Sequence, residues 1–573
     1  MIRKLANNVR GYLGETIATP LVMIGEVAME TTIPLVIAAI IDKGIKLNSI
    51  ETVWKYGILM VIMAIVSLCF GGAGGWFASK ASAGFAKNLR KKLFDKVQDF
   101  SFANIDRFST PSLITRLTTD VNNVSQTFQM MIRMMFRSPM MFIIATILAF
   151  KVNSRLAIIF VVAIPILAGG ILIIIKKAFP MFESMLKKYD DMNASVQENL
   201  TAIRVVKAFV HEDYEIDKFV KTSENVRRAM VKAERIVALN GPLMMLAVNS
   251  CTIAVLWFGG VEITEGLMTT GELVSFITYI MQILMSLMML SFIIVMFAFA
   301  KASASRICQV LDEDIDIKDG PESCSPEDGS IVFDDVCFSY ARDPNNLTID
   351  HLSCNIKSGE TIGIIGGTGS AKTTFVQLIP RLYDVLSGSV VVGGHDVRDY
   401  KLKTLRDSVA MVLQNNVLFS GTIKDNLRWG NPDATDAEIY DACSAAAAHD
   451  FIMSFPDGYD TVLGQGGVNV SGGQKQRLCI ARALLKKPKV LILDDSTSAV
   501  DTATDAKIRA AFRSELADTT KLIIAQRISS VSDADRIIVL VDGRIDAIGT
   551  HEQLLAANEI YREVYTSQQK GVE

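Results

Sequence analysis

This sequence has few histidines, no closely paired cysteines and no marked excess of positive or negative charge. Its 573 residues include only 5 histidines, and its 8 cysteines stand singly, with none in a Cys-x-x-Cys pair. Because structural zinc sites need several closely spaced Cys and His ligands, this scarcity argues against a zinc domain. The formal net charge of −3 is close to neutral and lacks the excess of basic residues that a nucleic-acid backbone attracts, so we expect no nucleic-acid partner.

Apolar residues, by contrast, are abundant and unevenly placed. They make up 50% of the chain, and the long apolar runs concentrate in its first half. A helix needs about 20 mostly apolar residues to cross a bilayer. Runs of that kind occur at residues 19–41, 54–78, 131–150, 156–175, 238–259 and 273–300. So many in succession favour membrane spans over buried core helices, and they predict that the chain lies in a lipid bilayer.

The basic residues between these runs indicate which side of the membrane each connection faces. The stretches after the second and fourth runs are rich in Lys and Arg, whereas residues 260–272 contain three Glu and neither Lys nor Arg. Because cytoplasmic loops carry the excess of Lys and Arg, both chain ends are predicted to lie in the cytosol. The two inner connections are long and helix-compatible throughout. Helices of that length should extend tens of Å below the bilayer.

From residue 330 onward the pattern changes to that of an α/β domain. Short apolar strands alternate there with helical segments and Gly-rich turns. A stretch rich in Asp, Glu, Ser and Pro precedes this part of the chain. We therefore expect a membrane domain with six spans at 1–311, a linker at 312–329, and a second domain at 330–573.

A Gly-rich loop in the second domain has the residues and the context of a phosphate-binding loop. It follows an apolar strand, precedes a helical segment, and consists of Gly366, Gly367, Thr368, Gly369, Ser370, Ala371, Lys372, Thr373 and Thr374. Backbone N–H groups in such a loop cradle phosphates, Lys372 neutralises their charge, and the Thr373 hydroxyl suits Mg²⁺. Ala371 stands where a second Gly is usual. If its backbone angles are helical, the methyl group is tolerated, because only a positive φ would demand Gly. We interpret the loop as functional.

Two further motifs follow the loop. Residues 489–494 form an apolar strand that ends on Asp494, a carboxylate suited to holding Mg²⁺ through water, and residues 471–474 read Ser-Gly-Gly-Gln just before a helix. In this order the motifs resemble the ATP-binding-cassette (ABC) family, and the whole chain resembles an exporter-type half-transporter of the six-helix, type IV architecture. The resemblance implies a polytopic α-helical membrane domain with long cytosolic extensions, joined to an α/β P-loop cassette.

The resemblance also implies roles for single residues. It implies that ATP and Mg²⁺ are the cofactors, that Tyr340 stacks on adenine, and that Gln414 joins Thr373 and Asp494 around Mg²⁺. Two chains of this kind sandwich two ATP molecules, each between one phosphate loop and the other chain's signature. Segments 108–119 and 202–212 resemble coupling helices at the tips of the inner connections. The residues implied to contact ATP held by the partner are Ser471, Gly472, Gly473, Gln474 and Asp501.

Two departures from the family pattern fall on catalytic positions. Asp495 replaces the usual Glu, the general base for the attacking water, and Gln526 replaces the usual switch histidine. Asp is one methylene shorter, which moves the carboxylate by about 1 Å, and such a shift can lower a rate about 100-fold. Gln can hydrogen-bond a phosphate but carries no proton or charge. Together these residues resemble the degenerate half of a heterodimeric exporter; the alternative is a slow homodimer with two weak sites.

The transported molecule is only weakly indicated by the sequence. A methionine stripe in the sixth apolar run favours either helix packing or a surface that accepts varied apolar ligands. We expect ATP-driven export of amphipathic small molecules or drugs. The alternatives are lipid or peptide export, siderophore import by the same architecture, and an ATP-gated channel or regulatory ATPase.

Glu26 and Glu30 in the first span are a possible substrate contact. They lie four residues apart on one helix face, where an unpaired carboxylate is costly. Arg133 and Arg137 in the third span have the same spacing. Either the glutamates pair with these arginines for structural reasons, or they line a cavity that accepts cationic compounds.

Overall fold

The computed structural model describes residues 2–321, 325–496 and 500–570, and it divides into two compact units. The first, the helical unit, comprises Met1–Gln98 and Thr110–Glu313. The second, the α/β unit, comprises Asp99–Ser109 and Asp314–Glu573. A short segment from the helical part of the sequence thus belongs to the α/β unit, which the sequence patterns did not indicate.

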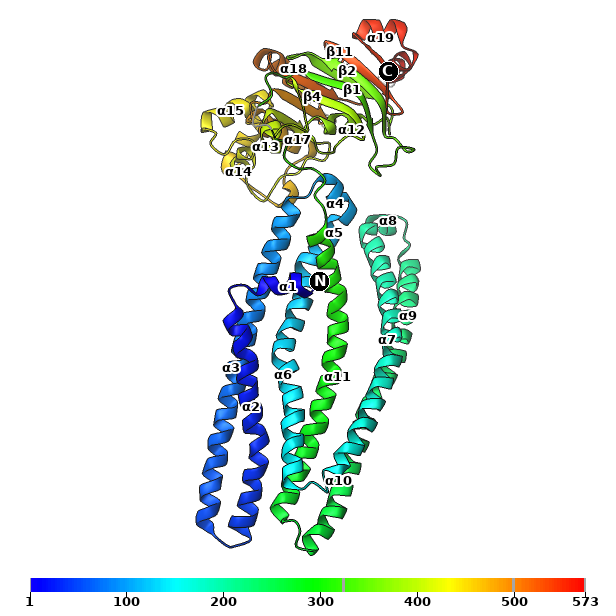
Figure 1. The fold of residues 1–573 in the computed structure, drawn as a ribbon. Helices are drawn as coiled ribbons and strands as arrows, with labels where there is room; N and C mark the ends of the chain where they lie inside the picture. The colour runs from blue at the N-terminus through cyan, green and yellow to red at the C-terminus, as the bar shows by residue number, and fades with distance from the viewer. Residues whose placement is uncertain (1, 322–324, 497–499, 571–573) are drawn as a thin grey trace. The chain divides into compact units, whose positions relative to one another are not determined.

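The helical unit consists of long helices joined by short turns (Figure 1). Within the described residues, six helical stretches are long and apolar enough to cross a membrane: Leu13–Ile45, Ile50–Gln98, Thr110–Val152, Ile158–Thr201, Glu212–Thr264 and Thr270–Leu290. The prediction of six apolar spans is therefore confirmed. The helices are α1 (Ile2–Ala6), η1 (Asn7–Val9), α2 (Leu13–Ala39), η2 (Ile40–Ile45), α3 (Ile50–Gln98), α5 (Thr110–Thr115), η3 (Arg116–Asp120), α6 (Val121–Val152), α7 (Ile158–Thr201), α8 (Ile203–Ala208), α9 (Glu212–Ala238), α10 (Asn240–Thr264) and α11 (Thr270–Asp312).

Aromatic side chains join neighbouring helices in the helical unit. Phe160 of α7 and Phe276 of α11 stack with centroids 5.2 Å apart inside a buried apolar cluster. The buried Tyr279 hydroxyl donates to the Thr31 carbonyl of α2 over 3.0 Å. A Tyr placed among apolar helices needs such a partner, since an unpaired hydroxyl would be costly there.

The α/β unit contains a six-stranded sheet in the order β12-β11-β3-β10-β9-β6 and a four-stranded sheet in the order β2-β1-β4-β5. In the larger sheet β11, β3, β10, β9 and β6 run parallel, while β12 is antiparallel to β11. The parallel strands are apolar almost throughout, as expected for strands that are covered on both faces. This unit confirms the α/β fold that the sequence predicted.

Its strands are β1 (Ile331–Phe338), β2 (Ile349–Ile356), β3 (Thr361–Gly366), β4 (Ser387–Val392), β5 (His395–Asp396), β6 (Val409–Val412), β7 (Gly421–Thr422), β8 (Val462–Leu463), β9 (Val490–Asp494), β10 (Thr520–Ile524), β11 (Arg536–Val541) and β12 (Arg544–Gly549). Its helices are α4 (Phe102–Phe108), α12 (Lys372–Leu378), α13 (Leu402–Ser408), α14 (Ile423–Arg428), α15 (Asp436–Ala445), α16 (His449–Met453), η4 (Gly458–Asp460), η5 (Gln465–Gly467), α17 (Gly472–Leu484), α18 (Thr502–Glu515), η6 (Ile528–Ser530), α19 (His551–Ala557) and α20 (Glu559–Lys570).

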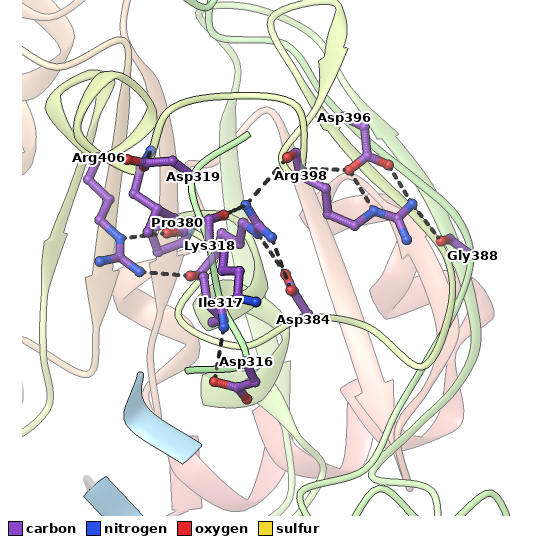
Figure 2. A network of polar contacts seen from close by, with 12 residues as sticks. Asp316, Ile317, Lys318, Asp319, Pro380, Asp384, Gly388, Asp396, Arg398 and Arg406 are labelled. Atoms are coloured by element: carbon purple, nitrogen blue, oxygen red, sulfur yellow. Dashed lines mark hydrogen bonds and ion pairs between the residues drawn. The ribbon is translucent and has the colours of Figure 1, made fainter. Parts of the chain in front are cut away.

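Part of the predicted linker is bound to the α/β unit. The Lys318 carbonyl accepts a hydrogen bond from Arg381 over 2.9 Å (Figure 2). The Asp319 carboxylate accepts one from the Leu402 N–H over 2.8 Å. Arg381 is only 6% exposed, so this guanidinium is held by several acceptors at once. The described linker residues after Glu313 therefore belong to the α/β unit rather than hanging free.

Candidate functional site

The carboxyl ends of three parallel strands bring the predicted site residues to one edge of the larger sheet. Ile364 of β3 and Asp494 of β9 both pair with Ile524 of the central strand β10. The phosphate loop follows β3, Asp495 follows β9, and Gln526 follows β10 by two residues. In open α/β sheets ligands bind at this edge, because loops from neighbouring strands converge there.

Lys372 points into the Gly-rich loop. Its Nζ donates to the carbonyl oxygens of Gly366 and Gly367 over 2.8 and 2.7 Å. Burial lowers the pKa of the Lys372 ammonium, while the Asp494 and Asp495 carboxylates oppose that shift. The loop thus holds a cation where α12 begins, and a phosphate placed there would meet both the cation and the helix N-terminus.

Ala371 has a left-handed backbone. Its φ of 67° and ψ of 20° lie in the left-handed region, so the condition of helical angles, under which its methyl group would be tolerated, is not met. The residue caps the start of α12, where the chain reverses from the strand into the helix. A non-Gly residue in this region is strained by about 1–2 kcal/mol, because its Cβ approaches a carbonyl oxygen. The usual Gly would be relaxed there.

The oxygen atoms suited to Mg²⁺ lie together. The Thr373 hydroxyl donates to Asp494 Oδ1 over 3.0 Å, and Asp494 is 2% exposed. Burial raises the pKa of the Asp494 carboxyl, and the hydrogen bond from Thr373 opposes this. A hydroxyl and a carboxylate beside a phosphate loop match the hard ligands that Mg²⁺ prefers, so these residues fit the ion. Gln414 joins the group by a hydrogen bond to Asp495.

The two residues that depart from the family pattern contact each other. Gln526 Nε2 donates to Asp495 Oδ2 over 2.7 Å, and the Gln526 carbonyl accepts from Gln568 Nε2 over 2.7 Å. Burial raises the pKa of the Asp495 carboxyl, while hydrogen bonds from Gln526 and Gln414 lower it. The carboxylate at the catalytic position is therefore held by two amide side chains.

Tyr340 lies just beyond β1 at the rim of the phosphate loop. Its side chain is 49% exposed, and its hydroxyl shares a 2.9 Å hydrogen bond with the Thr374 hydroxyl. The ring thus has accessible surface next to the loop, which an adenine stacked there would need. The structure thus brings Tyr340 to the loop with which the sequence analysis grouped it, and its role in adenine binding stays a prediction.

The predicted signature residues form a separate helix start. Ser471 caps α17: its Oγ accepts from the Gln474 N–H over 3.3 Å, and Gln474 Oε1 accepts from the Ser471 N–H over 2.8 Å. Asp501 caps α18 in a similar way, accepting from the Thr504 N–H over 3.0 Å. Residues 497–499, within the run between Asp494 and Asp501, lie outside the described residues.

In the helical unit the structure brings Arg137 to both predicted glutamates. Arg137 Nη2 donates to the two Glu30 oxygens over 2.9 and 2.8 Å, and its Nε lies 3.5 Å from Glu26 Oε1. Arg133, the other candidate, has a buried Nε without a hydrogen-bond partner. The observed pairing corresponds to the structural alternative considered for these glutamates.

A hollow between α7 and α10 was not indicated by any sequence motif. It has a volume of about 650 Å³ and is lined mostly by Leu, Ile, Val and Ala, with Arg155 and Glu262 also in its wall. Sequence reasoning also missed Phe102, Asp106 and Tyr383, which meet beside Tyr340. No motif marks these residues, and hundreds of positions separate the first two from the third.

Comparisons with known proteins agree with this geometry. Residues 16–287 match the family model described as ABC transporter transmembrane region, and residues 349–498 match the model described as ABC transporter. A Bacillus subtilis (strain 168) protein, named as the uncharacterized ABC transporter ATP-binding protein YfiB, is 40% identical over 548 residues, which cover 96% of this chain and 95% of that protein.

Two further similarities carry more specific names. The ATP-dependent lipid A-core flippase of Desulfotalea psychrophila (strain LSv54 / DSM 12343) is 34% identical over 488 residues, or 84% of either chain. A solved structure of a bacterial Atm1-family ABC exporter with ATP bound superposes with a TM-score of 0.85, covering 97% of this chain and 98% of that one. At 24% identity this last match shows the fold alone.

Proposed function

This chain belongs to the ABC transporter family, and we propose that it is the degenerate-site half of a heterodimeric exporter of amphipathic small molecules. The family membership makes it a multi-pass membrane protein whose ATPase activity is coupled to transport. The proposal adds three points: which of the two ATP sites hydrolyses ATP rapidly, which chain supplies the signature to that site, and which class of molecule is transported.

The observation that carries the proposal is the contact between Asp495 and Gln526. A general base must present a free carboxylate oxygen to the attacking water. Here Asp495 Oδ2 accepts a hydrogen bond from the Gln526 side-chain amide over 2.7 Å. Gln526, being neutral, can supply neither a proton nor a positive charge to a phosphate. We therefore expect ATP and Mg²⁺ to bind beside Lys372 and Thr373, and hydrolysis there to be slow.

The signature of the chain, in contrast, is intact. Ser471 caps a helix of 13 residues, with two glycines in its first turn that keep side chains away from an approaching phosphate. This arrangement supports the second part of the proposal, in which the chain completes a competent site whose catalytic Glu and His belong to a different partner chain.

Mutants of the assembled heterodimer test this assignment. Asp495→Ala should leave at least half of the ATPase rate, whereas replacing the partner's catalytic Glu by Gln should lower it about 100-fold or more, as loss of a general base does. Ser471→Ala should lower the ATPase rate about as far as the replacement of the partner's catalytic Glu, because Ser471 belongs to the signature that completes the partner's ATP site. Ser514→Ala is the matched control, since the Ser514 hydroxyl hydrogen-bonds the Ala510 and Ala511 carbonyls of its own helix α18. Equal losses from Asp495→Ala and the partner's Glu mutation would establish two equivalent sites and reject the proposal.

The proposed orientation places both chain ends in the cytosol of a cell that holds the transporter in its plasma or inner membrane. Stretches rich in Lys and Arg follow the apolar parts of α3 and α7, whereas the connection between α10 and α11 has neither residue. This distribution supports the orientation, because cytoplasmic connections carry the excess of Lys and Arg. ATP is supplied on that side, which fits the position of the α/β unit in the sequence after the last span.

The amphipathic class of substrate is supported by the hollow between α7 and α10. Its volume of about 650 Å³ suits a drug-sized molecule. An apolar wall with Arg155 and Glu262 in it matches a molecule with both apolar and charged parts. Lipid flipping is the second candidate, favoured by the similarity to the lipid A-core flippases of two organisms.

A further inference from the structure

The pairing of β1 with β2, neighbouring strands of the smaller sheet (Figure 1), is interrupted by two bulges. At the first, Cys337 of β1 faces two consecutive residues of β2, Asp350 and His351. At the second, two residues of β1, one of them Asp335, face a single residue of β2. His351 and Asp335 have left-handed backbones, with φ of 49° and 48°. A bulge re-aims side chains that strict alternation would send to opposite faces of the sheet.

Three side chains that can bind a metal converge at the first bulge. One ligand atom from each of Cys337, Asp350 and His351 lies within 4.8 Å of the other two. Thiolate, carboxylate and imidazole are all ligands of Zn²⁺ in proteins, and the two anions among them balance its charge. Tetrahedral bonds of about 2.0–2.3 Å put neighbouring ligand atoms about 3.3–3.8 Å apart, so small side-chain rotations would close this cluster around an ion.

Each of the three side chains also has a partner that suits a metal ligand. His351 Nδ1 lies 2.7 Å from Asp335 Oδ1, and a proton shared there leaves the Nε2 lone pair for a metal. Asp350 Oδ2 accepts from Arg544 Nε over 2.9 Å, which orients the carboxylate. Cys337 Sγ accepts from the His351 N–H over 3.4 Å, which favours the thiolate. Outer contacts of this kind fix metal ligands in the orientation that binding needs.

We propose that Cys337, Asp350 and His351 form a binding site for one Zn²⁺ ion, with water in the fourth position. The site shares no residue with the group that fits Mg²⁺, and its thiolate selects Zn²⁺ over the harder Mg²⁺. Cys337 is 5% exposed whereas His351 is exposed, so the ion enters from solvent and is held against the sheet. A bound ion ties the end of β1 to β2.

Strand pairing, and not a short motif, creates this zinc site. Its thiol and imidazole lie 14 positions apart in the sequence, and the bulge brings them together. The scarcity of Cys and His argues against a zinc domain, which needs four ligands in closely spaced pairs. That argument does not extend to a single ion bound across two paired strands.

Metal binding to the purified, tag-free, full-length dimer tests the inference, without nucleotide and with excess Mg²⁺ to occupy oxygen-only sites. By equilibrium dialysis and elemental analysis, wild type should bind one more Zn²⁺ per copy of this chain than Cys337→Ser. Co²⁺ in place of zinc should give a thiolate-to-metal charge-transfer band that Cys337→Ser lacks. X-ray absorption of the zinc bound at this site should show one sulfur at about 2.3 Å. His351→Ala and Asp350→Asn should each weaken Zn²⁺ binding at least about tenfold.

Cys354→Ser and His395→Ala are the matched controls, and both should keep wild-type zinc binding. Cys354 lies in β2, where burial raises the pKa of its thiol to about 12, and His395 lies in β5 of the same sheet. Wild-type affinity for zinc in either Cys337→Ser or His351→Ala would overturn the inference, as would a wild-type protein without the Co²⁺ charge-transfer band. His351 is exposed, so His351→Ala decides the test if Cys337→Ser folds poorly.

Discussion

Ala371 holds a left-handed backbone at a position where its family usually has Gly, and two opposing effects decide what that costs. The left-handed conformation strains Ala by about 1–2 kcal/mol. Ala, on the other hand, restricts the unfolded chain, which stabilises a protein by about 0.4–1 kcal/mol relative to Gly. The strain is the larger effect.

We therefore expect Ala371→Gly to stabilise the α/β unit by about 0.5–1 kcal/mol, and to raise its unfolding temperature by about 1–3 °C. Thermal unfolding followed by intrinsic fluorescence measures this. The control is Ala510→Gly in α18, where the exposed helical Ala should lose about 1 kcal/mol on the same change. A lower unfolding temperature for both variants would show that residue 371 is not strained.

The ion pair between Arg137 and the glutamates of α2 leads to a second prediction. Removing Arg137 leaves two carboxylates unpaired within a membrane span, which costs several kcal/mol. Arg137→Met should sharply lower the yield of monodisperse protein in mild detergent. Adding Glu30→Gln should recover part of the yield, because it removes one of the stranded charges.

Size-exclusion chromatography of equal membrane quantities measures that yield. Arg133→Met is the comparison variant, since Arg133 lies one turn away and, within the part of the chain that the structure describes, Arg137 is the arginine paired with Glu26 and Glu30. A full yield of Arg137→Met with a selective loss of cation transport would instead assign the glutamates to a substrate cavity.

Part of the site could be read from residue types alone. Lys372, Thr373 and Asp494 were predictable because a fixed spacing and a strand-to-helix context define them. The contact of Asp495 with Gln526 was only half predictable: both departures are visible in the sequence, but their mutual hydrogen bond depends on adjacent parallel strands. The φ of Ala371 could not be inferred, since the sequence shows the substitution and not whether the backbone has adapted to it.

At the scale of single elements, long helices were predictable and short ones were not. Each span needs a long apolar run, so α3 was visible from its composition. α4 has seven residues, too few for the spacing of Phe102, Ile105 and Phe108 to distinguish a helix, and its start is marked by Ser101 with Asn104, not by the more familiar Ser-x-x-Glu box. The expected coupling segment 108–119 overlaps α4 only at Phe108.

The extent of α3 shows why the boundary of the membrane part is hard to place. It runs for 49 residues, about 70 Å at the usual helical rise, whereas the hydrocarbon core is about 30 Å thick. A single helix therefore includes both an apolar span and a polar extension with Lys and Arg. Composition marks the change of environment, but the backbone continues without a break.

At the scale of the whole molecule, the substrate separates the two candidate functions. Proteoliposomes that contain the purified dimer should take up an amphipathic cationic dye in the presence of Mg²⁺-ATP, and should flip a fluorescent short-chain phospholipid several-fold more slowly. Dye fluorescence measures the uptake rate, and dithionite quenching measures the flipping rate. The background rates come from a dimer in which this chain carries Lys372→Ala and the partner lacks its catalytic Glu. Phospholipid flipping faster than dye uptake would favour the lipid candidate.

The assignment of Asp99–Ser109 to the α/β unit has a consequence for how the chain is made. On the ribosome, Asp106 emerges 277 residues before Tyr383, an interval of about 15–55 s at ordinary synthesis rates. Throughout that interval α4 lacks the partner that holds it, and seven residues are too few for a stable isolated helix. The contacts of the α/β unit with α4 therefore join two stretches of sequence that are made at different times. They form by capture of a segment synthesised between the two membrane helices α3 and α6.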